Sequence, residues 1–188
     1  FKLLKNEINE NILKDNYNYT FKVGEHIISK PVIVPAGYNL VVNKGTTLKM
    51  TKDSYIMVED GSIKFQGTVD EPIEIKSLEK KLSWKGIYIN SNFNKDNISI
   101  VNHVNISGIS YFDNGIIQLT GGLNFINSNV RISNSKIENS FSEDSINIVN
   151  SHFNIRSSEF NNSMSDGLDV DFGKGEIINT NFYNIKGD

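Results

Sequence analysis

The sequence predicts an all-β protein whose strands wind into a right-handed parallel β-helix, a solenoid of about six coils. Two observations support this prediction. Single apolar residues alternate with polar ones between clusters of Asn, Ser and Gly, and the chain carries an internal repeat of 22–23 residues. Alternation of period two is typical of half-buried strands, and a fixed repeat of this length is typical of stacked coils. A short N-terminal helix is expected to cap the first coil.

Composition narrows the classes of function. The chain has 188 residues and a formal net charge of −3, which gives no electrostatic footprint for nucleic acid or for an anionic membrane surface. No apolar run approaches the roughly 20 residues that span a bilayer. Cysteine is absent, which excludes disulfides and thiolate metal sites and fits an exported bacterial protein. We expect an extracellular or cell-surface location, with any export signal outside this chain.

The first segment departs from the strand pattern, because its apolar residues fall at helical spacing. Residues 1–14 are therefore predicted to form an amphipathic capping helix, the alternative being a linker remnant of a larger protein. The expected organisation is an N-terminal helix and cap segment over residues 1–25, then a β-helix over residues 26–188 that continues beyond the last residue. The apolar residues at helical spacing are Leu3, Leu4, Ile8 and Ile12.

The internal repeat specifies how the coils stack. The apolar positions of residues 123–137 recur 23 residues later in residues 146–160, and a further copy begins at Leu168. Each copy holds three short strands with inward apolar side chains, and no copy can bury that apolar side alone. One internal column is expected to contain Ile132, Ile155 and Ile177.

The repeat is less regular in the middle of the chain. Ile98 and Ile100 precede Leu123 and Phe125 by 25 residues and continue the apolar pattern backwards. The interval from Ile63 to Ile98 is longer, at 35 residues, so loops are expected to be inserted there. The two loops are expected around residues 77–83 and 91–97.

Polar residues repeat in the same register, which predicts columns of like side chains up the stack. Amide ladders can hydrogen-bond between coils, hydroxyl columns can satisfy the turn backbone, and opposite charges can pair across neighbouring strands. The predicted columns are Asn139 with Asn162 and Asn184, Ser135 with Ser158 and Thr180, and Lys136 with Glu159.

The segment 165–172 carries the most suggestive polar pattern. Leu168, Val170 and Phe172 alternate inward, so Asp169 and Asp171 are expected side by side on the outer face. A pair of carboxylates on one face can cleave a glycosidic bond, with one acting as acid and the other as base or nucleophile. The candidate catalytic residues are Asp166, Asp169 and Asp171.

A column of carboxylates is also expected, with Asp144 under Asp166 and Asp188 one coil later. Such a column is costly unless a cation, a shared proton or backbone amides compensate the charge. Calcium prefers several oxygen ligands, so these three residues are candidate ligands of a Ca²⁺ ion, the one cofactor that the sequence suggests. The alternative is that each Asp caps its own turn, as the Asp-Gly pair at 166–167 favours.

Aromatic residues provide candidate platforms for a sugar ring. Trp84 is the only tryptophan and follows an expected loop, and Tyr88 lies four residues later. Tyr111 and Phe112 precede Gly115 in an expected turn and together would form a small apolar patch. The alternative for each ring is burial at a corner of a coil, which is the usual behaviour of Trp.

Three motifs carry a family resemblance. Residues 34–48 resemble the "IPAGxxLxIxxGTTL" opening of surface β-helix proteins, and residues 61–87 resemble their "GxIxxxGTxxxPI…WxGI" continuation. Residues 166–172 are similar to the "DAxDxDF" coils of β-helix regions that accompany CotH-type surface proteins. The resemblance covers residues 27–188 and implies a pectin-lyase-like superfold, whose members include enzymes and non-enzymes. The Asn-Thr-Asp, Asp-Asp, Gly-His-Gly and Arg-Ile-Lys signatures of polygalacturonase-type relatives are missing.

These observations favour a non-catalytic module of an exported or surface bacterial protein, acting as a rigid spacer or a weak binder of a cell-surface or extracellular polysaccharide. The alternative is a polysaccharide-active enzyme (a lyase, epimerase or glycoside hydrolase) that works on an outer sheet face.

The C-terminal coil is expected to expose unpaired strand edges and apolar side chains, because only Lys186, Gly187 and Asp188 follow its last strand. Either further coils follow in a parent chain, or residues 168–188 associate end to end with a second copy in a symmetric homodimer.

Overall fold

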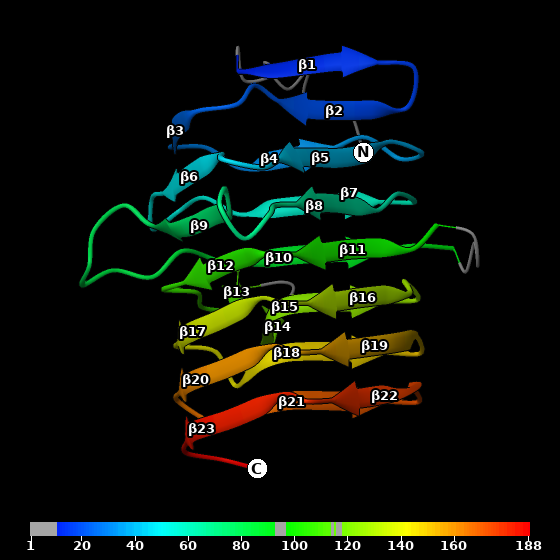
Figure 1. Ribbon diagram of the computed structural model, residues 1–188. Helices are drawn as coiled ribbons and strands as arrows, with labels where there is room; N and C mark the ends of the chain where they lie inside the picture. The colour runs from blue at the N-terminus through cyan, green and yellow to red at the C-terminus, as the bar shows by residue number, and fades with distance from the viewer. Residues whose placement is uncertain (1–10, 93–96, 114, 116–117) are drawn as a thin grey trace.

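The protein is described by a computed structural model that covers residues 11–92, 97–113, 115 and 118–188, and the described residues form strands and turns without a helix. Three sheets run along the molecule, and Figure 1 shows their strands stacked in successive layers from the first strand to the last. Sheet A contains β1 (Ile12–Asp15), β2 (Asn18–Phe21), β5 (Asn39–Asn43), β8 (Ile63–Gln66), β11 (Ser99–Asn102), β16 (Val130–Ser133), β19 (His152–Arg156) and β22 (Lys174–Ile178).

Sheet B contains β3 (Glu25–Ile28), β6 (Thr47–Met50), β9 (Ile73–Ser77), β12 (Val104–Ser107), β17 (Lys136–Ser140), β20 (Glu159–Ser163) and β23 (Asn181–Ile185). Sheet C contains β4 (Val32–Val34), β7 (Ile56–Glu59), β10 (Ile87–Asn90), β15 (Gly121–Ile126), β18 (Asp144–Val149) and β21 (Asp166–Asp171). A separate antiparallel hairpin is formed by β13 (Phe112–Asp113) and β14 (Gln118–Leu119).

The chain visits the three sheets in cyclic order. From β2 onward it passes from sheet A to sheet B to sheet C and back, and neighbouring strands within each sheet run parallel. Only β1 pairs antiparallel within these sheets, on β2. The predicted all-β, parallel and solenoid-like architecture is therefore confirmed at this level.

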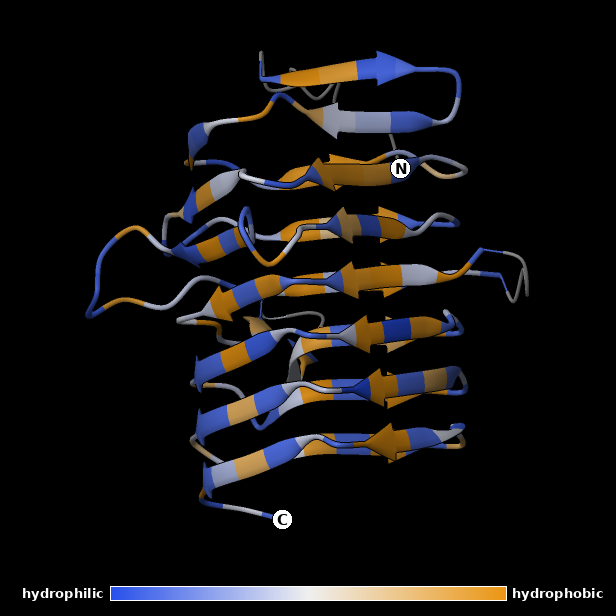
Figure 2. Ribbon diagram, viewed as in Figure 1, coloured by the Kyte–Doolittle hydropathy of each residue, from blue (hydrophilic) through white to orange (hydrophobic). Residues whose placement is uncertain are grey.

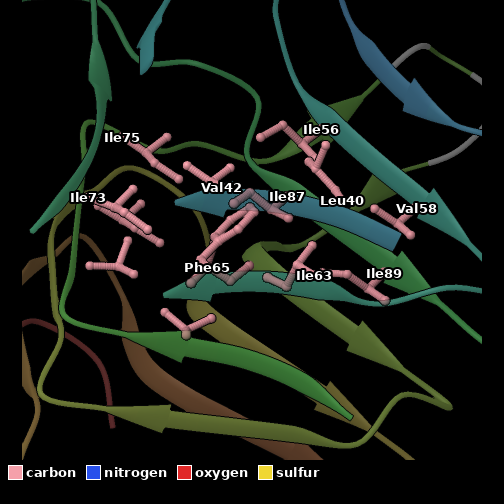
Figure 3. Packing of buried hydrophobic residues seen from close by; sticks show 14 of the residues in the cluster. Leu40, Val42, Ile56, Val58, Ile63, Phe65, Ile73, Ile75, Ile87 and Ile89 are labelled. Atoms are coloured by element: carbon pink, nitrogen blue, oxygen red, sulfur yellow. The ribbon is translucent and has the colours of Figure 1, made fainter. Parts of the chain in front are cut away.

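The core lies inside the three sheets, where equivalent apolar side chains stack from coil to coil. Figure 2 shows apolar and polar residues alternating along the strands, and Figure 3 shows Leu40, Ile63, Val42 and Phe65 pointing into the interior. Leu40 pairs with Ile63 and Val42 pairs with Phe65, and none of the four is more than 1 % exposed. Burial of side chains of this size contributes about 1.5–3 kcal/mol each, which is the main source of stability for a sheet of short strands.

The predicted register is confirmed in the later coils. Ile146 pairs with Leu123 on one side and with Leu168 on the other, as the repeat requires. Ile155 pairs with Ile132 and with Ile177. Ile132 and Ile155 are fully buried. Ile177 stacks as expected but is 45 % exposed, because β22 is the outermost strand of its sheet and no described strand covers it.

The prediction for Ile98 and Ile100 was wrong. Strand β11 pairs Val101 with Phe65 and with Ile132, so Val101 is the residue that enters the core. Ile100 consequently faces outward, since the alternation in β11 begins at Ser99. A loop at residues 78–86 separates β9 from β10, where the sequence suggested an insertion. The second expected insertion falls between β10 and β11, where residues 93–96 lie outside the described residues.

The predicted helix covers residues 1–14, and residues 11–14, the part of it that the structure describes, are not helical. Ile12–Asp15 form β1, which pairs with β2 as an antiparallel hairpin, and residues 1–10 lie outside the described residues. Cross-strand contacts explain the difference, because Lys14 lies over the rings of Tyr19 and Tyr38. Helical spacing in the sequence is thus overridden by pairing with the neighbouring strand.

The predicted polar columns connect the coils. The Asn162 side-chain amide donates to Asn139 Oδ1 at 3.2 Å, and Lys136 pairs with Glu159 at 3.2 Å. Asn184 occupies the equivalent turn position but donates to Asn161 instead of Asn162. The hydroxyls of the Ser/Thr column each donate to the carbonyl two residues earlier, as Ser135, Ser158 and Thr180 show.

Among the described non-glycine residues, left-handed backbone conformation is confined to three columns. All described non-glycine residues with positive φ lie at turns from sheet C to sheet A, at turns from sheet A to sheet B, or at one bend inside sheet B. Asn tolerates this conformation better than most residues, which explains why Asn is so abundant in this chain. The three columns are Asp60, Asn127, Asn150 and Phe172, then His103, Asn134, Ser157 and Asn179, then Asn139, Asn162 and Asn184.

The prediction that Phe172 points inward was wrong, because β21 ends at Asp171 and Phe172 lies in the first of these columns, where the backbone turns. Its φ is 54°, its side chain is 92 % exposed, and the two preceding coils carry Asn at this position. We predict that Phe172→Asn stabilises the protein by about 1 kcal/mol, because it relieves backbone strain. The new amide can also continue the ladder in which Asn150 donates to Asn127. The melting temperature should rise by roughly 2–4 °C in a thermal unfolding experiment.

The matched control is Phe172→Ala, which removes the exposed ring and keeps the strained Cβ. Equal melting temperatures for the Asn and Ala variants would contradict the explanation by backbone conformation.

Candidate functional site

The outer face of sheet C gathers the acidic residues that the sequence singled out. Leu168 and Val170 pair with Ile146 and Ile148 of the core, so the alternate positions of the strand, Asp169 and Asp171, point outward. Asp169 stacks on Asn147 of β18, and Asp171 is exposed. The structure thus brings these carboxylates to one face, as expected from the alternation.

Asp144 and Asp166 begin β18 and β21 and pair with each other across the two strands. The Asp144 side chain is outside the core although Ile146 is inside, because the alternation breaks at this corner. Ser145 turns inward instead, and its hydroxyl contacts that of Ser163 at 2.5 Å. The corner therefore places two carboxylates next to the outward row of Asn147 and Asp169.

Asp144 is the most perturbed carboxyl of this group. It is only 5 % exposed, and its Oδ2 accepts a hydrogen bond from the Thr120 hydroxyl at 3.0 Å. Burial raises the pKa of Asp144 to about 6, and the nearby charges of Asp169, Glu143 and Asp166 act in the same direction, while the Thr120 bond opposes them. A carboxyl with this pKa can hold or release a proton under mildly acidic conditions.

Thr120 links Asp144 to a second polar group. Its hydroxyl oxygen also accepts from the Asn147 amide at 3.3 Å, while Asn147 Oδ1 is buried and has no hydrogen-bond partner among the described residues. Gly121 allows this close approach, because a Cβ there would lie 2.8 Å from Asn124 Oδ1 and from the Asn147 Cβ. The result is a compact polar cluster with one acceptor oxygen left unused.

The Asp166 carboxylate accepts hydrogen bonds from one backbone amide and one side-chain hydroxyl. Its Oδ1 accepts from the Asp188 amide at 2.8 Å and from the Ser165 hydroxyl at 3.3 Å. Asp188 thus contributes its main chain to this contact, and its carbonyl accepts from the Gly167 amide. Asp166 thus bonds to the main chain of the next coil, and not to an amide of its own turn as the Asx-turn alternative expected.

No group of three or more His, Cys, Asp or Glu side chains is placed to hold a metal ion within the described ranges. One oxygen of Asp144 accepts from Thr120, and one oxygen of Asp166 accepts from the Asp188 amide. The calcium site at Asp144, Asp166 and Asp188 therefore stays a prediction from the sequence.

Three of the four aromatic candidates are buried. Trp84 has no exposed surface, and its indole nitrogen donates to the Ser107 carbonyl at 2.9 Å. Tyr88 lies on the outer face of sheet C, but Phe112 of the hairpin covers it at a ring distance of 5.6 Å. Tyr111 alone keeps substantial exposure, at 41 %. A buried ring offers no face to a sugar, so Tyr111 is the one member of the set that can act as a platform.

A groove that the sequence did not suggest lies over the turns between sheets A and B. It has a volume of about 460 Å³ and follows three consecutive coils, at β16–β17, β19–β20 and β22–β23. Its lining is almost entirely amide and hydroxyl, with one ion pair between Lys136 and Glu159. The lining residues are Asn105, Asn134, Ser135, Lys136, Ser157, Ser158, Glu159, Asn179 and Asn181.

The signal for this groove was present in the sequence as the Ser135, Ser158 and Thr180 column. This Ser/Thr column predicted that a turn lies at this position in each coil, but it did not predict that the turns form a groove. The left-handed residues Asn134, Ser157 and Asn179 bend the backbone there, and a bend of this kind is not visible in hydrophobic periodicity.

Comparison with protein-family models, with curated proteins and with solved structures finds no match to the chain. No helix long and apolar enough to cross a bilayer occurs in the part of the chain that the structure describes.

The raised pKa of Asp144 makes a prediction about stability. The folded protein binds the Asp144 proton more tightly than the unfolded chain does, so stability falls as the pH rises from about 4 to about 6. Asp144→Asn removes this charge, and the variant should melt roughly 2–4 °C above the parent protein at pH 8, if about 1 kcal/mol is recovered. The difference should disappear at pH 4, where Asp144 is protonated. Melting curves across this range provide the measurement, and a difference that is independent of pH would contradict the assignment.

Proposed function

We propose that the chain is a non-catalytic module of an exported or surface bacterial protein, a rigid spacer that binds carbohydrate weakly. We further propose that its fold is a right-handed parallel β-helix of about six coils within the pectin-lyase-like superfold. Parallel strands connected within one sheet are right-handed in nearly all proteins, which supports the hand. The motifs shared with β-helix regions of CotH-type surface proteins support the superfold.

The polar groove over the turns between sheets A and B supports carbohydrate binding. Sugar hydroxyls both donate and accept hydrogen bonds, and the groove offers amides and hydroxyls that do the same. An extended chain of sugars can follow the groove, because equivalent side chains repeat at the strand spacing of roughly 4.8 Å. Each hydrogen bond replaces one to water and contributes about 0.5–1.5 kcal/mol net, so binding without an aromatic platform is expected to be weak.

The spacer role follows from the stacking. Each coil is tied to the next by main-chain hydrogen bonds in three sheets and by the columns of polar side chains. Relative movement of two coils would break all of these at once, so the described layers are expected to behave as one rigid body.

The test of the binding proposal changes the groove without changing the core. Asn179→Gly and Asn181→Ala remove two amides from the lining, and glycine suits the positive φ of 49° at residue 179. We expect the double variant to lose about fivefold or more in affinity for a neutral polysaccharide, measured by affinity electrophoresis. The control Asn90→Ala removes an exposed amide from sheet C and should bind normally. Binding of the double variant at parental strength would contradict the proposal.

A second candidate function rests on Asp144. A buried carboxyl with a pKa of about 6, close to the carboxylate of Asp169, has the composition of an acid and base pair for glycan cleavage on the outer face of sheet C. In this alternative, a lyase, epimerase or hydrolase, Asp144 donates the proton and Asp169 serves as base or nucleophile.

The enzyme alternative predicts that Asp169→Asn abolishes release of reducing ends or unsaturated sugars from a polysaccharide panel, while the fold is retained. Asp60→Asn is a matched control, because Asp60 lies at a turn from sheet C to sheet A, where Asn fits the positive φ. If the parent protein releases no product from any member of the panel, the non-catalytic function is favoured. Equal turnover by the parent and by Asp169→Asn would exclude Asp169 from the reaction.

A further inference from the structure

Half of the lysine and arginine side chains on the described sheet strands have a carboxylate partner. Lys49, Lys76, Lys136 and Arg156 are all paired in this way, at N–O distances of 2.6–3.8 Å. Lys64 of β8 and Arg131 of β16 differ, because neither has a carboxylate partner among the described residues, and the same holds for Lys14 and Lys174 at the two ends of the sheet. Lys64 and Arg131 are therefore two positive charges in the middle of sheet A that the described part of the protein does not neutralise.

The strand register places these two cations close together. Lys64 and Arg131 occupy the same outward row, with Ile100 of β11 between them. Their Cα atoms are two strand spacings apart, or roughly 10 Å. Both side chains are long enough to reach one ligand that lies between them. The Lys64 ammonium donates to the Ile98 carbonyl, which leaves its other hydrogens for a ligand.

The pair is electrostatically unfavourable without a ligand. Partial burial lowers the pKa of Lys64, and the nearby charge of Arg131 lowers it further. An anion between the two side chains would reverse this second effect, because it would replace a repulsion by two attractions. Arg in addition offers a planar fork that matches carboxylate and phosphate oxygens.

The next outward row supplies neutral groups for the rest of a sugar. Gln66, Asn102 and Ser133 are neighbours across β8, β11 and β16, one pleat from the cation row. Asn102 Oδ1 accepts from Ser133 and from Asn134, and Asn134 lines the groove between sheets A and B. The cation pair and the groove are thus connected by a continuous strip of polar side chains.

We propose that Lys64 and Arg131 form an anion-binding site on the outer face of sheet A, which takes the carboxylate or phosphate group of an acidic glycan. The inference rests on the proposed binding function and deepens it, since it names the class of glycan. An acidic polysaccharide lying across β8, β11 and β16 places its charged substituent on the cation pair and its hydroxyls on the polar strip.

Three polymers test the site on the whole chain: a polyuronate, a polymer of sugar or glycerol phosphates, and a neutral polysaccharide of similar length. The protein should bind at least one of the acidic polymers more tightly than the neutral one, in a titration at low salt, and raising the salt should weaken that binding. The acidic polymer that binds identifies whether carboxylate or phosphate is the ligand group. Arg131→Gln and Lys64→Gln should each reduce its affinity about tenfold or more, because each removes one charge-assisted hydrogen bond.

Two further variants keep the result interpretable. Lys80→Gln removes a positive charge from the exposed loop 78–86 and should bind as the parent does. Arg131→Lys keeps the charge and should retain more affinity than Arg131→Gln, whereas a merely structural role of Arg131 would make the two equal. Parental affinity in Lys64→Gln and Arg131→Gln, or no preference for either acidic polymer, overturns the site.

Failure of this site and failure of the groove give different results. If the neutral polymer binds and Asn179→Gly with Asn181→Ala weakens it, the groove stands even when the acidic polymers are not preferred. If an acidic polymer binds through Lys64 and Arg131 and the groove variant has no effect, the anion site stands and the groove does not. If the parent protein binds none of the three polymers, both are wrong.

Discussion

Burial of each apolar side chain in this protein depends on the equivalent side chain of the next coil. Ile155 has no shelter within its own short strand and is covered by Ile132 on one side and Ile177 on the other. Removing a buried Ile to Ala costs about 2–5 kcal/mol, against a total stability of about 5–15 kcal/mol for a typical domain. Any slip between coils would change many such contacts together, so the register must be held tightly. The columns of Asn, Ser and Thr at the corners hold it from outside, because they bond only when equivalent residues stand above one another.

The regular coils could be predicted from the sequence because the same constraint acts on every copy. A period of 22–23 residues brings Leu123, Ile146 and Leu168 into one column, and the structure pairs them so. Prediction failed where the period is interrupted. The 25-residue offset compared strands of different sheets, because β11 lies in sheet A whereas Leu123 lies in sheet C and pairs with Ile87. Within sheet A, Phe65 pairs with Val101 and not with Ile100, and in a strand a change of one residue turns the other face inward. Ile100 thus moved to the surface, where it now separates Lys64 from Arg131.

Prediction of the candidate sites was limited by contacts between distant segments. The outward position of Asp169 and Asp171 follows from alternation alone and could be read directly. The burial of Tyr88 could not, because it depends on Phe112 folding back from the β13–β14 hairpin. In residues 12–14 a strand replaced the predicted helix for a similar reason, since pairing with β2 outweighs local helical spacing. Two faces and one corner of the described column carry different chemistry: carboxylates on sheet C, the cations Lys64 and Arg131 on sheet A, and neutral amides at the corner between sheets A and B.

The burial of Trp84 has a consequence for how the unfolding of this protein can be followed. It is the only tryptophan in the chain, it has no contact with solvent, and it lies beside Ile109 near the middle of the stack. Its fluorescence therefore reports on the central layers and is insensitive to fraying at either end. Circular dichroism, by contrast, averages over all strands. The separation between the fluorescence and circular dichroism transitions during denaturation measures how far the outer coils open before the centre does. Trp84 is therefore a built-in probe of cooperativity along the stacked layers.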